Sequence, residues 1–300
     1  MTAMPPTCSP RTRTCRASSS PAPPRSTPSP TSWTMSRRPR SVSEHTVPEQ
    51  GALVLHINAP LQSWGVGAQG TVRSTNAEPT LSGMVGLIGN AMARTRDDDI
   101  SDLAALPMGV RVDRPGVLTR DFFTAGTTTG VVQREESIKG GRRVFRDRVV
   151  NDGAVGTKFY LSGAAFTVAL QVDREFGERI AAALARPARA LFLGRKSCPV
   201  TYMDRAVWVP GTLEEVLRTF PLDPDLLPDP ERPWVGRGVV APARLTLVLP
   251  AGPDEVGAQP RKDVPVSFTR EARRYATRFV RFAHVDRDTL TVRDSEEESA

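Results

Sequence analysis

An apolar strand, a glycine-bearing loop and an amphipathic helix follow one another between residues 52 and 92, and this order most constrains the fold. The segment ALVLHI (52–57) has the length and composition of a buried strand. After Pro79, apolar residues recur at helical spacing, which predicts a helix that packs on a sheet. They are Met84, Val85, Leu87, Ile88, Ala91 and Met92.

The loop between this strand and helix contains Gly65, Gly67 and Gly70, and glycine lets a backbone approach a ligand closely. Trp64 offers a flat face beside them, and Thr80 is a plausible helix cap. A loop of this kind before a helix N-terminus suits an anion held by backbone amides and the helix dipole. The alternative is an ordinary loop that leads into a buried packing helix, and spacing alone leaves both open.

The basic charge of the chain comes from its first 40 residues. The whole chain has 40 basic and 33 acidic residues, and residues 1–40 hold seven arginines, no acids and nine of the 27 prolines. Subtracting 7 from 40 leaves 33 basic against 33 acidic residues beyond position 40, so the pI near 9.9 does not argue for nucleic-acid binding. We expect residues 1–48 to be disordered, as a basic arm, a transit-like segment or sequence upstream of the true start.

Several classes of protein are disfavoured by the residues that the chain lacks. No apolar run is long enough to span a bilayer, so we expect a cytoplasmic protein without a membrane partner. Three cysteines and three histidines without paired spacing predict no metal and no cofactor. No nucleophile-elbow motif is present, and we assign no catalytic residue and no small-molecule substrate. Metal-free RNA cleavage would need a base from a few candidates, which also suit packing or surface positions: His56, Tyr160, Tyr202, Lys158 and Lys196.

A polar, arginine-rich segment runs from Pro115 to Phe159 and is too long for an ordinary connection. We interpret it as a projecting hairpin. Phe145 lies inside its basic centre, and cations interleaved with an aromatic suit a strand that holds phosphates and stacks on bases. A solvated loop is the alternative. The basic residues are Arg134, Lys139, Arg142, Arg143, Arg146 and Arg148.

Two other segments place arginines where they could meet a ligand. The segment 108–114 alternates apolar and polar residues, which predicts a half-exposed strand that carries Arg111 and Arg114. A predicted strand at 191–199 ends in a turn with Arg195 and Lys196. These adjacent cations suit either phosphate binding or a solvated strand end. Strand, helix, strand, hairpin, strand and helix in this order predict an α+β, ferredoxin-like βαββαβ core with an inserted hairpin and additional C-terminal strands.

Five segments together resemble the CasD family, the RAMP-type backbone subunit of the type I-E CRISPR Cascade complex. The first segment follows the opening pattern of the family. This pattern is a strand, the sequence PLQSWG, an arginine and a threonine two positions apart, the sequence PTxSG and an apolar helix. It includes Ser63, Trp64, Arg73, Thr75, Thr80, Ser82 and Gly83. The others are GVRVDRPG (109–116), AAFTVAL (164–170), LFLGRKSCP (191–199), and PVSF (265–268) with RRYATRFV (273–280).

This resemblance implies a non-catalytic subunit that caps the five-prime handle of CRISPR RNA and contacts a neighbouring backbone subunit and the large subunit. It implies a RAMP-type domain at 49–286 with a thumb at about 115–160. The acidic composition of residues 287–300 predicts a disordered tail. The rival is a metal-independent endoribonuclease, as in the type I-C relative. The chain departs from the pattern at Ala68, Gln69, Gly70 and Leu81, where a serine, an arginine, an aromatic and a cation are expected.

The resemblance and the basic clusters imply RNA contacts in two places. These are the opening run, which is the strand end, loop and helix at 59–89, and the arginine-rich segments. The predicted RNA-binding residues are Ser63, Trp64, Arg73, Thr80, Ser82, Gly83, Arg111, Arg114, Arg142, Arg143, Phe145, Arg146, Arg148, Arg195 and Lys196.

Overall fold

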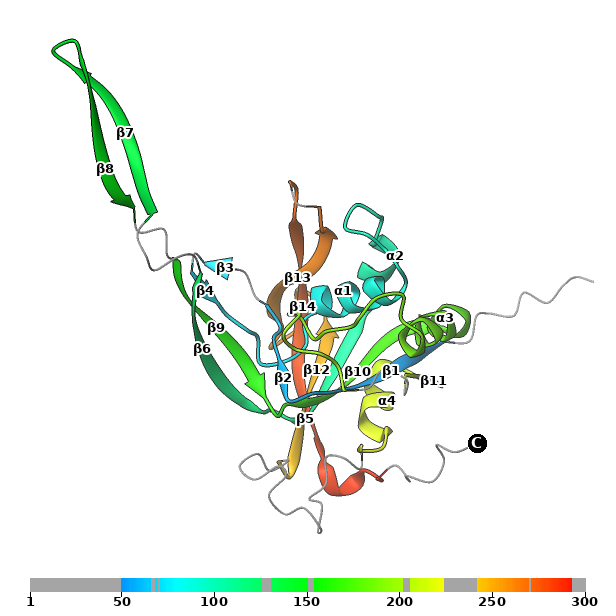
Figure 1. Cartoon of the computed structure of the whole chain (residues 1–300). Helices are drawn as coiled ribbons and strands as arrows, with labels where there is room; N and C mark the ends of the chain where they lie inside the picture. The colour runs from blue at the N-terminus through cyan, green and yellow to red at the C-terminus, as the bar shows by residue number, and fades with distance from the viewer. Residues whose placement is uncertain are drawn as a thin grey trace, which may run out of the picture. The chain divides into compact units, whose positions relative to one another are not determined.

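The computed structural model describes residues 50–65, 68–69, 71–125, 131–150, 154–201, 206–223, 242–269 and 271–292. These residues form a mixed α+β structure that is rich in strands and has few helices (Figure 1). The predicted extension at residues 1–48 lies outside the described part of the chain, as do residues 293–300.

The larger sheet has seven strands in the order β11-β1-β10-β5-β12-β14-β13, and neighbouring strands are antiparallel. The strand predicted at 52–57 is β1, and the strand predicted at 108–114 is β5. In sheet order the strands are β11 (Val207–Pro210), β1 (Gln50–Asn58), β10 (Ala165–Asp173), β5 (Met108–Arg114), β12 (Arg244–Ala251), β14 (Arg274–Asp286) and β13 (Gln259–Ser267).

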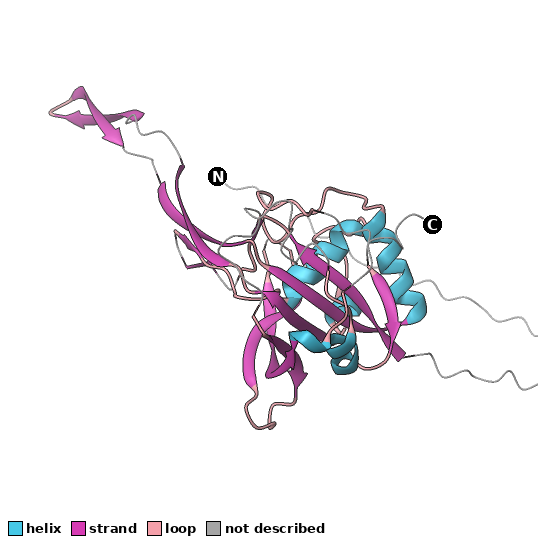
Figure 2. Cartoon of the chain, turned by 90° about the horizontal axis from the view of Figure 1, so that it is seen from below, coloured by secondary structure: helices cyan, strands magenta, loops and turns pink. Residues whose placement is uncertain are grey.

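Helices cover both faces of this sheet (Figure 2). Leu53 and Leu55 of β1 belong to the cluster that includes apolar residues of α1 and α3, whereas Val54 belongs to the cluster on α4. Strands covered on both sides are apolar on both sides. The prediction of a half-exposed strand at 108–114 is therefore wrong, because β5 is buried along both faces. The helices are α1 (Leu81–Ala91), α2 (Ser101–Ala104), α3 (Arg174–Ala185) and α4 (Leu213–Thr219).

The segment predicted as one hairpin contains two antiparallel strand pairs. In the first, β6 (Val117–Ala125) pairs with β9 (Ala154–Ser162). Strand β9 also pairs with two short strands from the opening run. These are β2 (Leu61–Gln62) and β4 (Val72–Arg73), and β4 pairs in turn with β3 (Ala68–Gln69). In the second, β7 (Val131–Lys139) pairs with β8 (Arg142–Val150) across a turn at Gly140 and Gly141. Both turn glycines have positive φ, as a tight hairpin turn requires.

The structure defines three further boundaries. The matching segment AAFTVAL (164–170) lies at the start of β10, which a turn at Gly163, where φ is 64°, separates from β9. The strand expected at 191–199 is a turn closed by a single bridge between Phe192 and Pro199. Residues 287–292, expected to belong to the acidic disordered tail, are ordered: a 3-10 helix, η2 (Arg287–Thr289), follows β14, and Val292 bridges to Leu222.

The strands at the two ends of the seven-stranded order contain proline. Pro210 pairs with Gly51 at one end, and Pro260 and Pro265 pair with β14 at the other. Proline has no backbone N–H to donate and is found at sheet edges for that reason.

Candidate nucleic-acid interface

The N-terminus of α1 is held by side chains of this chain. Thr80 Oγ1 accepts a hydrogen bond from the Gly83 amide at 3.2 Å, and Asp263 Oδ2 on β13 accepts one from the Leu81 amide at 2.9 Å. Arg278 in turn donates to both carboxylate oxygens of Asp263, at 2.8 and 3.0 Å. The positive end of the helix dipole therefore already faces a carboxylate. The packing alternative fits this end of the helix better than an anion site does.

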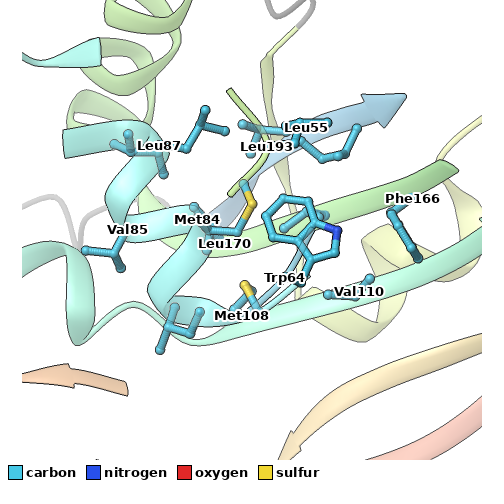
Figure 3. Close-up of a cluster of buried hydrophobic side chains, with 14 of the residues drawn as sticks. Leu55, Trp64, Met84, Val85, Leu87, Met108, Val110, Phe166, Leu170 and Leu193 are labelled. Atoms are coloured by element: carbon cyan, nitrogen blue, oxygen red, sulfur yellow. The ribbon is translucent and has the colours of Figure 1, made fainter. Parts of the chain in front are cut away.

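Trp64 lies in the core (Figure 3) and is 1% exposed, packed among residues that include Met84, Val110 and Phe166. Its indole N–H donates to Gln62 Oε1 at 3.1 Å. A Cβ at Gly83 would lie 2.8 Å from Trp64 Cε3, so glycine is needed for this close approach.

Three predicted RNA contacts from the opening run are corrected by burial. The side chains of Ser63, Trp64 and Thr80 are at most 2% exposed and do not reach a ligand in this arrangement. Ser82 and Gly83 are half-buried, and their contact with RNA stays a prediction. Arg73 is exposed.

Arg111 is also misassigned, because its side chain is fully buried beneath α4. Its guanidinium pairs with Asp113 and donates to the carbonyl oxygens of Leu217 at 3.0 Å and of Phe220. It therefore satisfies carbonyls at the C-terminal end of α4, where a cation also complements the helix dipole. Thr167 donates to the same Asp113, which completes a buried polar network.

Arg114 and Arg195 donate hydrogen bonds to backbone carbonyls of the fold. Arg114 Nε donates to the Gly163 carbonyl, and burial lowers the pKa of its guanidinium below the ordinary value, with Asp223 opposing the shift. Arg195 donates to the carbonyls of Phe159 and Arg73, both at 2.9 Å. These bonds fix the turn that carries Arg195 against β9 and β4.

One side of the β6–β9–β4 sheet carries more cations than acids and is called its basic face; exposed Asp121 of β6 lies on this face, directly across from Lys158. Arg73 on β4 is in parallel register with Lys158 on β9, so the two side chains lie next to each other. Lys158 Nζ lies 4.0 Å from the ring centroid of Phe123, which suits a cation–π contact. Arg195 stacks on the Tyr160 ring at 4.8 Å on the same face of β9. The sequence did not predict that Lys158 lies beside Arg73, because a parallel pairing between segments about 85 positions apart leaves no local signal.

The β7–β8 hairpin separates its charges onto two faces. Directly paired residues point to the same side of an antiparallel pair, so Lys139, Arg142 and Arg146 share one face with Glu135. These three cations are exposed. We call this side the cationic face.

The opposite side of the hairpin has paired charges and apolar residues. Arg143 Nε lies 3.2 Å from Glu136 Oε1, and the Arg134 guanidinium lies 5.7 Å from the Phe145 ring centroid. Phe145 is 54% exposed. Arg142 and Arg146 are therefore on the other side of the hairpin from Arg143 and Phe145, a division that the sequence cluster did not predict. The Arg148 side chain lies outside the described part of the structure.

Neither a metal centre nor a membrane helix is found in the described ranges. Across those ranges, His, Cys, Asp and Glu side chains form no group of three or more that could hold a metal ion. The helices in the same ranges are too short or too polar to cross a bilayer.

Comparison with known proteins gives one family and several relatives. A family model described as CRISPR-associated protein (Cas_Cas5) matches residues 52–281. The CRISPR system Cascade subunit CasD of Escherichia coli strain K12 is 30% identical over 157 residues, which cover 50% of this chain and 67% of that protein.

Two solved structures resemble the chain along most of their length. A crystal structure of a Cas protein is 32% identical, with a TM-score of 0.55 over 81% of this chain and 98% of the other. A chain of a CRISPR RNA-guided surveillance complex is 28% identical, with a TM-score of 0.58 over 82% of this chain and 96% of the other.

Proposed function

Because the chain belongs to the Cas5 family of CRISPR-associated proteins, we propose that it is a non-catalytic RNA-binding subunit of a CRISPR RNA-guided surveillance complex. The relatives named above support this assembly, and the CasD resemblance of the sequence agrees with the family match. In this proposal the subunit caps the five-prime handle of a type I-E CRISPR RNA. Its partners are that RNA, a neighbouring backbone subunit and the large subunit, and its location is cytoplasmic.

The strand order supports a ferredoxin-like core. Strands β1, β5, β10 and β11 follow one another in the chain, with α1 after β1 and α3 after β10. Their order in the sheet is β11-β1-β10-β5, so each βαβ unit is split by an antiparallel strand. This is the arrangement of the split βαβ motif. In the proposal, residues 49–286 are the RAMP-type domain and the strand pairs at about 115–160 are its thumb.

The cationic face of the β7–β8 hairpin is the observation that carries the RNA-binding role. Arg142, Val144 and Arg146 are alternate residues of β8 and lie on one face of the hairpin. Lys139 lies directly across from Arg142. Cations repeated along a strand face can follow successive phosphates, and RNA affinity then depends strongly on salt. Arg73 and Lys158 add cations on the β6–β9–β4 sheet, and Lys196 adds an exposed cation in the turn at 191–199.

The test compares two double variants of the hairpin with equal charge change. Binding of a synthetic five-prime handle RNA is measured over a series of salt concentrations. For Arg142→Ala with Arg146→Ala, we expect the slope of log affinity against log salt to fall by about 1.4, at about 0.7 for each lost phosphate contact. Arg134→Ala with Arg143→Ala is the matched control and should lower the slope less, since Arg143 is already paired with Glu136.

An unchanged slope in the first variant would contradict the assignment, and equal losses in both would contradict the division between faces. The endoribonuclease alternative is tested on the unmodified protein with CRISPR repeat RNA in the presence of a chelator. Discrete cleavage products would refute the non-catalytic role.

A further inference from the structure

The parallel pairing of β4 with β9 is short, although it places two cations of the basic face side by side (Figure 1). Among the described residues, the strands are joined at two residue pairs, Val72 with Thr157 and Arg73 with Lys158. The Thr157 amide also donates to the Thr71 carbonyl at 3.0 Å. Most strands are longer than two residues, so this pairing alone gives weak control over the position of Arg73.

Arg195 bridges the two strands at the end of this pairing. Its Nη1 donates to the Phe159 carbonyl of β9 at 2.9 Å, and its Nη2 donates to the Arg73 carbonyl of β4 at 2.9 Å. A longer bond of 3.4 Å reaches the Ser74 carbonyl. The same guanidinium stacks on the Tyr160 ring, with its central carbon 4.8 Å from the ring centroid. One planar group therefore joins the end of β4 to β9.

The turn that carries Arg195 is held against the opening run. The Ser63 amide donates to the Leu193 carbonyl at 3.1 Å, and the Leu193 amide donates to the Cys198 carbonyl at 2.7 Å. Gly194 has a φ of 82°, and a Cβ there would overlap the Ser63 carbonyl oxygen. Glycine therefore permits this close approach of the two backbones. The guanidinium of Arg195 is thus fixed by the fold before any ligand binds.

Arg195 and Arg73 differ in what their side chains can still bind. Two of the three guanidinium nitrogens of Arg195 already donate to backbone carbonyls, whereas Arg73 is exposed. We propose that Arg195 is a positioning residue, which holds Arg73 beside Lys158 so that both cations meet phosphates of the RNA. It acts through the backbone of Arg73 and does not itself touch RNA. This inference rests on the proposed function for the RNA contact of Arg73.

A substitution that keeps the charge separates positioning from direct contact. Lysine retains the positive charge that attracts a phosphate, but it lacks the planar fork that donates to two strands at once. For Arg195→Lys, we expect the slope of log handle RNA affinity against log salt to fall by about 0.7, equivalent to one lost phosphate contact. Added to Arg73→Ala, it should cause no further fall. Arg189→Lys is the matched control and should leave the slope unchanged, because Arg189 also donates to two backbone carbonyls, those of Ala93 and Arg94.

Two results of these salt series would overturn the proposal. A wild-type slope in Arg195→Lys would mean that only the charge is needed, as in a direct phosphate contact. A further fall of the slope when Arg195→Lys is added to Arg73→Ala would mean that Arg195 acts independently of Arg73. Circular dichroism spectra verify that each variant is folded under the binding conditions.

Hydrogen exchange of the full chain without RNA separates this inference from the proposed function. We expect Arg195→Lys to speed exchange of the Thr157 amide by about tenfold, because the bond of this amide to the Thr71 carbonyl depends on the position of β4. Arg189→Lys should leave that exchange unchanged. Wild-type exchange in Arg195→Lys would refute the positioning role. Faster exchange together with an unchanged salt slope in Arg73→Ala would support the positioning of Arg73 and contradict its proposed RNA contact.

Discussion

Arg111 and Arg146 lie on strands of the same chain, yet their surroundings give them opposite roles. Arg111 is fully buried, pairs with Asp113 and donates to carbonyls at the end of α4. Arg146 is exposed on the cationic face of the β7–β8 hairpin. The comparison teaches that an arginine in a strand is available to RNA only where a second layer does not cover that strand. Substitutions in each region test this distinction.

The largest expected effect comes from removing the buried cation. Arg111→Ala leaves Asp113 buried without its ion-pair partner, and breaking a buried pair costs about 3–5 kcal/mol in the free energy of unfolding. Urea denaturation followed by circular dichroism measures this loss. Arg142→Ala, the exposed control, should leave the unfolding midpoint unchanged. Equal midpoints for the two variants would remove the distinction between the regions.

Two glycines of α1 test whether the opening run is a packing element. A Cβ at Gly83 would lie 2.8 Å from Trp64, whereas a Cβ at Gly86 has no neighbour within 4 Å. We expect Gly83→Ala to destabilise the protein by about 1–3 kcal/mol through overpacking. Gly86→Ala should stabilise it by about 0.5–1 kcal/mol, because alanine favours the helix interior. Thermal unfolding of both variants measures whether their changes in stability have opposite signs. A Gly83→Ala protein as stable as the wild type would contradict the tight packing.

The basic face of the β6–β9–β4 sheet predicts a smaller effect on RNA. Lys158→Ala should lower the salt slope of handle RNA binding by about 0.7, equivalent to one phosphate contact. Arg120→Ala removes the same charge from the opposite side of the sheet and serves as the control. A larger loss for Arg120→Ala would contradict the assignment of RNA to the face that carries Lys158.

The smallest expected effect concerns acid stability. Arg218, and then Arg281, hold the pKa of the Glu214 carboxyl below its usual value. The resulting stabilisation is fully present above the ordinary pKa of a glutamate carboxyl and is lost as pH falls through the lower folded-state pKa. Glu214→Gln should therefore flatten the decline of the thermal midpoint with acidity below pH 5. An unchanged pH profile would show that these ion pairs contribute no measurable stability.

Local patterns predicted much of the fold. The segments that form β1, α1 and β5 carry the apolar patterns of their elements, and Thr80, a predicted helix cap, accepts a hydrogen bond from the Gly83 amide at the start of α1. Burial of the site residues could not be predicted in the same way. The alternation around Arg111 is the same whether α4 covers that side of β5 or water does. The helix dipole at Leu81 likewise meets a carboxylate from Asp263, which is 182 positions away in the sequence.

The prolines at both ends of the seven-stranded sheet bear on how copies of this subunit behave before assembly. Unpaired edges invite other strands to add, and proline on an edge prevents that addition by removing N–H donors. Pro210, Pro260 and Pro265 place this block on β11 and β13. The two edges of the seven-stranded sheet therefore offer fewer N–H donors to a strand of another molecule, which disfavours edge-to-edge pairing of this sheet between copies.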